Sequence, residues 1–339
     1  MSKKPQLRFF VVLSALWAVF LVLGPVAQAK SPSEGGRYFI SSKNSLVKSL
    51  FGVQHEFKTG FTSDLTSGEV WTLEKIFKVS VTNVPLYKVS PVNTTAAETA
   101  SANVLNDVIG GLTLDKSKQR TTAPDSPVVW GVKKIYNDES LKSTSGGKGV
   151  NVAVLDTGAN IKHLDLTNQI KDCKDFTRGP IPRSTCEDKN GHGTHVAGII
   201  AADGGFDGNG LWGMASEVNL FIYKVCRNDG TCWADDVAAG LDYAKDNSIN
   251  VANMSLGGNV ENPLLKDIID GALKNNVLMV AAAGNDGPER GTINWPAAYP
   301  GACTQPACFG SAWDSNLPRS PLLPRASARA FAPFAAPAP

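Results

Sequence analysis

From residue 149 onward, short apolar runs rich in β-branched residues alternate with segments whose apolar residues have helical spacing. The runs lie at residues 150–155, 218–223, 250–254 and 277–281, and the helical segments at residues 235–245 and 263–274. Strands that are apolar throughout are buried on both faces, and strands that alternate with helices form parallel sheets. The sequence therefore predicts an α/β fold with a doubly wound parallel sheet. In such sheets, sites form at the carboxyl ends of the strands.

Composition limits the class of protein. The 339 residues include 33 Lys and Arg against 31 Asp and Glu, so the net charge is +2, and 42% of the residues are hydrophobic. A chain this apolar and this weakly charged is neither a disordered tail nor a dedicated nucleic-acid binder. Its length predicts about two domains, each able to bury its own core.

The first residues have the order of a secretory signal peptide. Lys3, Lys4 and Arg8 precede an uncharged apolar run at residues 9–23, and small residues follow up to Ala29. A membrane anchor is the alternative, but the run is shorter than the ~20 apolar residues that a spanning helix needs. We expect cleavage after Ala29, a secreted protein and no membrane contact after cleavage.

All six cysteines lie in the second half of the chain. An even number in an exported protein favours disulfides, and their clustering favours pairs between neighbours. The expected pairs are Cys173 with Cys186, Cys226 with Cys232, and Cys303 with Cys308. A metal site that uses Cys186 with the nearby His192 and His195 is the competing interpretation.

The segment before the alternating region is polar and free of cysteine. Strand-like runs lie at residues 70–73 and 77–81, and a short helix is expected at residues 104–109. Residues 115–127 are rich in Lys, Thr, Ser and Pro, which is typical of an exposed linker.

Two motifs carry candidate chemistry. Asp156 directly follows the first buried strand and is turned by Gly158, and a second Asp-Thr-Gly, which an aspartic protease would need, does not occur. Residues 190–200 place glycines around His192, with His195 three residues later. This pattern predicts a helix packed closely on the sheet with an imidazole at its N-terminal end.

Together with residues 128–132, 253–258 and 281–287, these motifs resemble the subtilisin-like serine proteases, in the order of that family. The resemblance runs from about residue 128 to about residue 312. It implies a subtilisin-like fold and a secreted endopeptidase that hydrolyses peptide bonds with an Asp/His/Ser triad.

The resemblance assigns roles residue by residue. His192 would be the general base, Asp156 would orient the imidazole, and Asn285 would donate to the oxyanion. His195 would be structural.

Two further sets of residues follow from the resemblance. Gly230 on one side, and Ser255, Leu256 and Gly257 on the other, would be the edges that bind an extended polypeptide substrate. Asp165 lies where relatives place a calcium ligand, although a solvated surface Asp is an equal alternative. No cofactor is required for the chemistry, and a monomer is expected.

The resemblance also divides the chain. A signal peptide at residues 1–29 would precede a small α+β propeptide at residues 30–124, which assists folding and blocks the cleft. A peptidase domain would span residues 125–315. Residues 316–339 are rich in Pro and Ala and depart from the family, and we expect either a frameshift or a natural proline-rich linker.

The family's serine motif does not occur in the 339 residues, and the expected position falls about 190 residues after Asp156, near position ~345. We therefore expect a domain that is incomplete at its C-terminus and a chain that is inactive. Three alternatives stay open: a pseudoprotease that binds peptides, an inhibitor that acts through the propeptide, and a metal-dependent hydrolase that uses His192 and His195.

Overall fold

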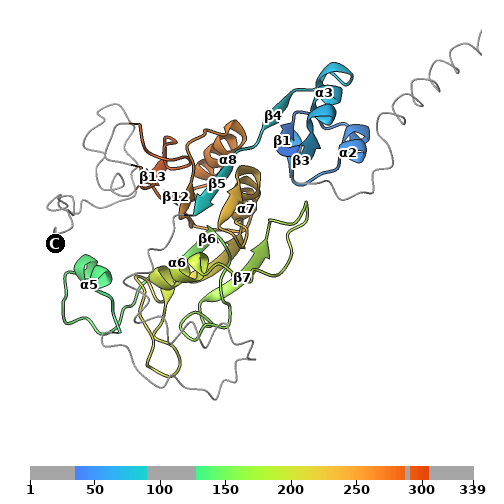
Figure 1. Ribbon diagram of the computed structural model, residues 1–339. Helices are drawn as coiled ribbons and strands as arrows, with labels where there is room; N and C mark the ends of the chain where they lie inside the picture. Colours follow the sequence, from blue (N-terminus) through green and yellow to red (C-terminus); the bar gives the residue numbers. More distant parts are fainter. Residues whose placement is uncertain (1–34, 90–126, 287–290, 305–339) are drawn as a thin grey trace, which may run out of the picture.

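The computed structural model describes residues 35–89, 127–286 and 291–304 (Figure 1). Its elements in chain order are β1 (Gly35–Ile40), α2 (Ser45–Phe51), β2 (Glu56–Phe57), β3 (Gly60–Thr66), α3 (Ser67–Lys75), β4 (Val81–Asn83), β5 (Leu86–Val89), α5 (Trp130–Tyr136), β6 (Asn151–Asp156), β7 (Ile170–Asp175), α6 (His192–Ala201), β8 (Asn219–Lys224), β9 (Thr231–Trp233), α7 (Ala234–Asp246), β10 (Val251–Met254), β11 (Leu256–Gly257), α8 (Pro263–Lys274), β12 (Leu278–Ala281) and β13 (Ala302–Thr304).

The central sheet confirms the predicted fold class. Six strands run in the order β13-β12-β10-β6-β8-β7, and every neighbouring pair is parallel. Each of the four predicted apolar runs overlaps one of these strands, to within one residue at either end. The edge strand β7 was not predicted because its sequence, with two Asp and two Lys among six residues, has no apolar run.

The strands are buried on both faces, as a parallel sheet requires. Val152 and Val154 of β6 belong to the core that Ala197 of α6 completes, whereas Ala153 and Leu155 pack into the core formed by α7 and α8. Alternation along β6 therefore fixes the strand between two helical layers, and its last residue is held at the carboxyl edge of the sheet.

Residues 35–83 form a smaller α+β part, which we call the N-terminal unit (blue in Figure 1). Its four strands are antiparallel in the order β2-β3-β1-β4. Its own core consists of Ile40, Val47, Phe51, Phe61, Leu65 and Leu73.

Two strand predictions in this unit are wrong. Residues 70–73 lie inside helix α3, which begins with a capping box: the Thr66 hydroxyl accepts from the Glu69 N–H, and the Glu69 carboxylate accepts from the Thr66 N–H at 2.7 Å. This cap fixes a helix where β-branched and aromatic residues favoured a strand. In the second run, only Val81 lies in a strand, β4. The predicted helix at residues 104–109 lies outside the described residues, as does all but the last residue of the predicted linker.

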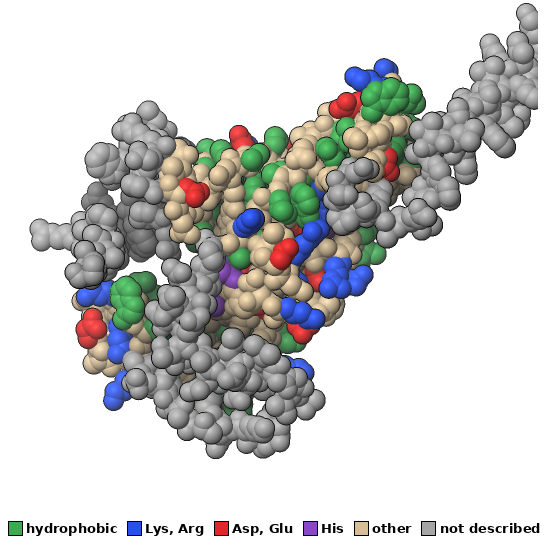
Figure 2. All heavy atoms as spheres, viewed as in Figure 1, with side chains coloured by type: hydrophobic (Ala, Val, Ile, Leu, Met, Phe, Trp, Pro, Cys, Tyr) green, Lys and Arg blue, Asp and Glu red, His purple; other side chains and the backbone are tan. Residues whose placement is uncertain are grey.

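No helix in the described ranges is long and apolar enough to span a membrane. The apolar run at residues 9–23 lies outside those ranges. Basic and acidic side chains are interspersed on the face drawn in Figure 2, in keeping with the small net charge.

Candidate active site

Asp156 is the last residue of β6 and is fully buried. Its backbone carbonyl accepts from the N–H groups of Val225 and Cys226, which follow β8, at 2.9 and 3.1 Å. Its carboxylate accepts from the N–H of Thr157 at 2.7 Å. The position of the carboxyl group is therefore fixed by two adjacent strands.

His192 is the first residue of α6 and is 8% exposed. Its Nδ1 lies 2.8 Å from Oδ1 and 3.0 Å from Oδ2 of Asp156. A carboxylate only accepts hydrogen bonds, so Nδ1 donates to Asp156, and in the neutral ring Nε2 is the acceptor. The structure thus brings together the two residues that the sequence singled out, in the tautomer that a general base needs.

The close approach of α6 to the end of β6 requires a glycine at position 193. A Cβ on Gly193 would lie 2.1 Å from the carbonyl oxygen of Gly158 and 3.1 Å from Oδ1 of Asp156. The first turn of α6 can therefore contact the end of β6 only because residue 193 has no side chain.

Asp188 organises the loop before His192, and the sequence analysis did not single it out. Its Oδ1 accepts from Asn190, Gly191 and Thr157, and its Oδ2 accepts from the N–H and hydroxyl of Thr194. Burial would raise the pKa of Asp188, but the bonds from Thr194, Gly191 and Asn190 outweigh it and hold the pKa below its ordinary value. The Asp-Lys-Asn-Gly turn at residues 188–191 was the signal that could have found it.

Lys224 was also missed. It ends β8 opposite Asp156, is 5% exposed and donates to the carbonyl of Thr157. Burial lowers the pKa of Lys224, and the charges of Asp188, Asp175 and Asp156 oppose this effect. The buried side chain of Lys224 therefore holds the turn that follows Asp156.

The cysteines support the disulfide interpretation over the metal one. Cys173 is bonded to Cys186, and Cys226 to Cys232, as predicted. A disulfide sulfur is not a thiolate ligand, so the alternative metal site loses Cys186 as a ligand. The third predicted pair involves Cys308, outside the described residues.

His195 lies one turn further along α6 and is exposed. Partial burial and the neighbouring His192 lower its pKa. Histidine side chains reach the surface near the middle of the face shown in Figure 2.

Asn285 is exposed and lies four residues beyond the end of β12, at the same edge of the sheet as Asp156. The preceding Gly284 has a φ of 91°, and a Cβ there would lie 2.2 Å from Nδ2 of Asn294. The turn that presents Asn285 therefore requires glycine.

The predicted substrate edges are occupied by the chain itself. Strand β5 pairs antiparallel with β11, which contains Leu256 and Gly257, and with β9, which follows Gly230. The Val89 N–H donates to the Gly230 carbonyl at 3.0 Å. Ser255, half-buried, lies just before β11 and accepts from Nδ2 of Asn253 at 3.0 Å.

The glycines at these edges leave room for β5. A Cβ on Gly258 would lie 2.6 Å from Cδ1 of Tyr87, and one on Gly230 would lie 3.0 Å from Cγ2 of Val89. Tyr87 is 1% exposed, and its hydroxyl donates to the Val260 carbonyl at 2.9 Å. Two edges that lie far apart along the chain, β9 and β11, thus bind one extended strand, in the way predicted for a substrate.

Asp165 is buried rather than solvated, with 4% exposure. Its Oδ2 accepts from the N–H of Leu211 at 3.1 Å, and its backbone carbonyl accepts from Asp203. The glycine-rich loop at residues 203–211 therefore folds against this carboxylate.

Comparison with known proteins shows the family of the chain. The profile of the Subtilase family matches residues 147–308. The "Subtilisin" of Bacillus sp. (strain TA39) is 36% identical over 306 residues, which cover 85% of this chain and 68% of that protein. The major intracellular serine protease of Bacillus subtilis (strain 168) is 43% identical over 175 residues, 50% of this chain and 54% of that protein.

Two solved structures are also similar to this chain. The S41 psychrophilic protease is 46% identical with a TM-score of 0.52, over 54% of this chain and 60% of its own. Sphericase is also 46% identical, with a TM-score of 0.51, over 52% of this chain and 58% of its own. The chain spans a little more than half the length of these two proteins and of the intracellular protease.

The family profile covers the part of the chain that holds Asp156 and His192, and one relative matches over more than two thirds of its length. The chain belongs to the subtilase family of serine proteases.

Proposed function

We propose that the chain is the precursor of a secreted endopeptidase in which Asp156 and His192 are two members of an Asp/His/Ser triad. The hydrogen bond of 2.8 Å between Nδ1 of His192 and the buried Oδ1 of Asp156 carries this proposal. It leaves Nε2 free to take a proton, and it places a carboxylate where the charged imidazole forms.

The steps follow from these roles. Nε2 of His192 takes the proton of the serine hydroxyl as the oxygen attacks the substrate carbonyl, and it returns the proton to the leaving amine. Asp156 stabilises the imidazolium throughout. Asn285 donates its side-chain amide to the oxyanion, a contact worth about 2.7–4 kcal/mol where it has been removed in this family.

The nucleophile is the part that the 339 residues do not supply. At the family's spacing it follows the aspartate by about 190 residues, near position ~345. Because the family's serine motif does not occur in the 339 residues, this polypeptide by itself is proposed not to cleave peptides.

The N-terminal part is proposed to be the propeptide, at residues 30–124, ahead of a peptidase domain at residues 125–315. Strand β5 supports this, because it pairs with both edges of the cleft and buries Tyr87 there. A segment bound in this way excludes a polypeptide substrate by competition. The two proposed partners of the monomeric peptidase domain are thus its own propeptide and its polypeptide substrate.

Secretion is proposed from residues 1–29 and agrees with the two disulfides, since these bonds persist in oxidising compartments. A structural calcium ion is proposed near Asp165. The proposal is supported by the burial of the Asp165 carboxylate, which accepts from the Leu211 N–H, because calcium prefers oxygen ligands. The chemistry itself needs no cofactor.

A second candidate is a pseudoprotease that holds peptides. The binding of β5 favours it, because backbone pairing at β9 and β11 needs no serine. Labelling with a fluorophosphonate separates the candidates when it is applied to the protein secreted by its source cells. A labelled form that contains His192 supports the endopeptidase, whereas an unlabelled form that binds peptides supports the pseudoprotease.

The site itself is tested on the 339-residue chain by nitrogen NMR of the histidine rings. We expect His192 to carry its proton on Nδ1 and the Asp156→Asn variant to lose this tautomer preference. Asp165→Asn is the matched control, a change at another buried Asp, and should leave it unchanged. An unaltered His192 spectrum in Asp156→Asn would contradict the proposed role of Asp156 in orienting the ring. Fluorophosphonate labelling of the 339-residue chain would contradict the proposal that it lacks an activated serine.

A further inference from the structure

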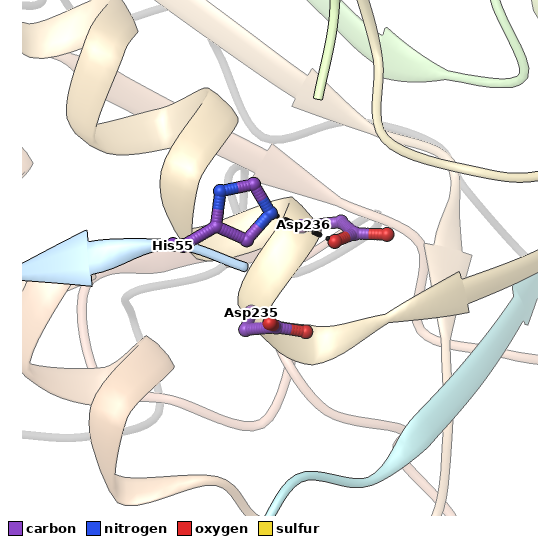
Figure 3. Close-up of side chains that lie close together, drawn as sticks. All are labelled: His55, Asp235 and Asp236. Atoms are coloured by element: carbon purple, nitrogen blue, oxygen red, sulfur yellow. Dashed lines mark hydrogen bonds and ion pairs between the residues drawn. The ribbon is translucent and has the colours of Figure 1, made fainter. Parts of the chain in front are cut away.

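A buried cluster of charged side chains joins the N-terminal unit to the start of α7, which directly follows β9. Figure 3 shows its centre, where the His55 ring points toward Asp236 and Asp235 lies one residue before it. We call it the Asp236 cluster, and its members are Arg37, His55, Thr62, Asp64, Asp235 and Asp236.

The contacts cross between the two parts of the chain. Nε2 of His55 lies 2.9 Å from Oδ1 of Asp236, and Nη1 of Arg37 donates to the same oxygen at 2.8 Å. The hydroxyl of Thr62 donates to Oδ2 of Asp235 at 2.6 Å. All of these donors come from the N-terminal unit, and both carboxylates come from the first turn of α7.

The cluster holds more negative than positive charge. Asp235 and Asp236 are 0% and 1% exposed; among the described residues, the guanidinium that reaches them is that of Arg37, which also donates to Asp64 at 2.9 Å. Oδ2 of Asp236 is buried and accepts no hydrogen bond from the described residues. An ionised Asp236 is therefore incompletely compensated where it is buried.

The groups facing Asp236 come from each element packed against it. They are Arg37 of β1, His55 before β2, Thr62 and Asp64 of β3, and Asp235 of α7 itself. Burial and the charge of Asp235 raise the pKa of Asp236 to about 6, against the opposing effects of His55 and Arg37. The buried Oδ2 without a hydrogen bond from the described residues, and the neighbouring carboxylate of Asp235, thus both favour a raised pKa for Asp236.

A divalent metal ion is a poorer occupant, although one His and two Asp side chains lie within ligand distance of one another. Arg37 already donates to Asp236 at 2.8 Å and approaches Asp235 at 3.4 Å. An ion between these carboxylates would have to displace a guanidinium that is itself buried.

We propose that the Asp236 cluster is a proton-binding latch, which holds the N-terminal unit on α7 more tightly in mildly acidic than in alkaline solution. When the unit separates, Asp236 becomes solvated and releases the proton. Control of access to the cleft by the latch rests on the proposed function of the N-terminal part. The pH-dependent contact between the N-terminal unit and α7 does not depend on that function.

The direction of the pH dependence follows from the linkage between proton binding by Asp236 and closing of the latch. A carboxyl group whose pKa is higher in the closed state favours closing below that pKa, and this contribution is lost as the pH rises through about 6. Relative to an ordinary Asp pKa near ~3.9, the closing equilibrium should be about tenfold more favourable at pH ~5 than at pH ~8.

Hydrogen exchange on the full chain tests this at two amides. The Ala234 N–H donates to the Pro85 carbonyl at 3.0 Å and reports the contact at the start of α7, whereas the Val89 N–H reports occupancy of the cleft. After correction for the intrinsic exchange rate, we expect Ala234 to be about tenfold more protected at pH ~5 than at pH ~8.

Asp236→Asn should remove the pH dependence, because its amide cannot ionise. Asp242→Asn is the control: Asp242 is on the same helix, is paired with Lys245 at the surface and should keep the wild-type response. Equal protection of wild-type Ala234 at the two pH values, or an unchanged response in Asp236→Asn, would overturn the latch. A latch response with no protection of Val89 at either pH would instead overturn the proposed blocking of the cleft.

Discussion

The backbone N–H of Val89 donates to the carbonyl of Gly230 at 3.0 Å, so a strand from the N-terminal part of the chain lies between the two edges predicted for a substrate. Backbone pairing on both sides makes β5 the middle strand of a three-stranded sheet. Its side chains then decide how long it stays bound, since any extended peptide can form the same backbone bonds.

Tyr87 is the side chain that we expect to hold β5. It is 1% exposed, and its hydroxyl donates to Val260 at 2.9 Å. Truncation of a buried aromatic residue costs about 3–5 kcal/mol. Tyr87→Ala should therefore raise the exchange rate of the Val89 amide at least ~100-fold, as measured by hydrogen exchange.

Lys88→Ala is the matched control on the same strand, because Lys88 is exposed and Lys88→Ala leaves the backbone pairing intact. It should change the exchange of Val89 by less than about threefold. Equal acceleration by the two variants would show that the backbone, and not Tyr87, holds the strand.

The contact of Asp156 with His192 and the central sheet could be predicted from the sequence because both depend on local patterns. A buried run that ends in Asp156, and glycines around His192, each appear within about ten residues. The contact between them then follows from strand ends that share one edge.

What could not be predicted depends on partners far apart in the chain. His55 and Asp236 have no common motif, and neither do Val89 and Gly230. Helix α3 was misjudged for a different reason. Its β-branched and aromatic residues favour a strand, but the capping box of Thr66 and Glu69 and the burial of Leu73 favour a helix.

Asp188 should contribute to stability in a pH-dependent way. Its bonds to Thr194, Gly191 and Asn190 lower its pKa, so the contribution is present above an ordinary Asp pKa near ~3.9 and is lost as the pH falls through the lowered value. Asp188→Asn replaces one acceptor oxygen by a donor and should cost at least about 2 kcal/mol at pH ~7.

Urea unfolding of the two proteins at pH ~7 and pH ~3 measures this difference, which should be smaller at the lower pH. Asp138→Asn is a control on an exposed turn, where Ser140 supplies the bonds. A difference between Asp188→Asn and wild type that stays constant over this pH range would exclude the ionised carboxylate as its source.

The two disulfides should have separable effects. Cys173 and Cys186 are 13 residues apart and Cys226 and Cys232 are 6 apart, so the chain-entropy estimate is about 3 and about 2.3 kcal/mol of global stability, respectively. Only the shorter loop includes Gly230 and ends in β9. Replacing its two cysteines by serine should therefore accelerate exchange at Val89 beyond the loss of global stability.

Replacement of Cys173 and Cys186 by serine is the control for that local effect. It should lower the urea midpoint more, while the exchange of Val89 changes only as far as global unfolding requires. The reverse ranking at Val89 would show that the bond beside Gly230 does not position the edge strand.

Calcium should stabilise the chain through Asp165. The carboxylate is 4% exposed and accepts from Leu211, so a bound cation would join it to the loop at residues 203–211 and add stability that only the folded state provides. At a free concentration 100 times the Kd, the gain is about 2.7 kcal/mol.

Thermal unfolding in calcium and in a chelator should therefore give a higher midpoint in calcium for wild type and a much smaller difference for Asp165→Asn. Asp242→Asn, at the surface of α7, should retain the full difference. Equal midpoints in calcium and chelator for the wild-type chain would mean that the buried carboxylate is satisfied by the Leu211 N–H and its protein surroundings, and that the loop needs no ion to keep its fold.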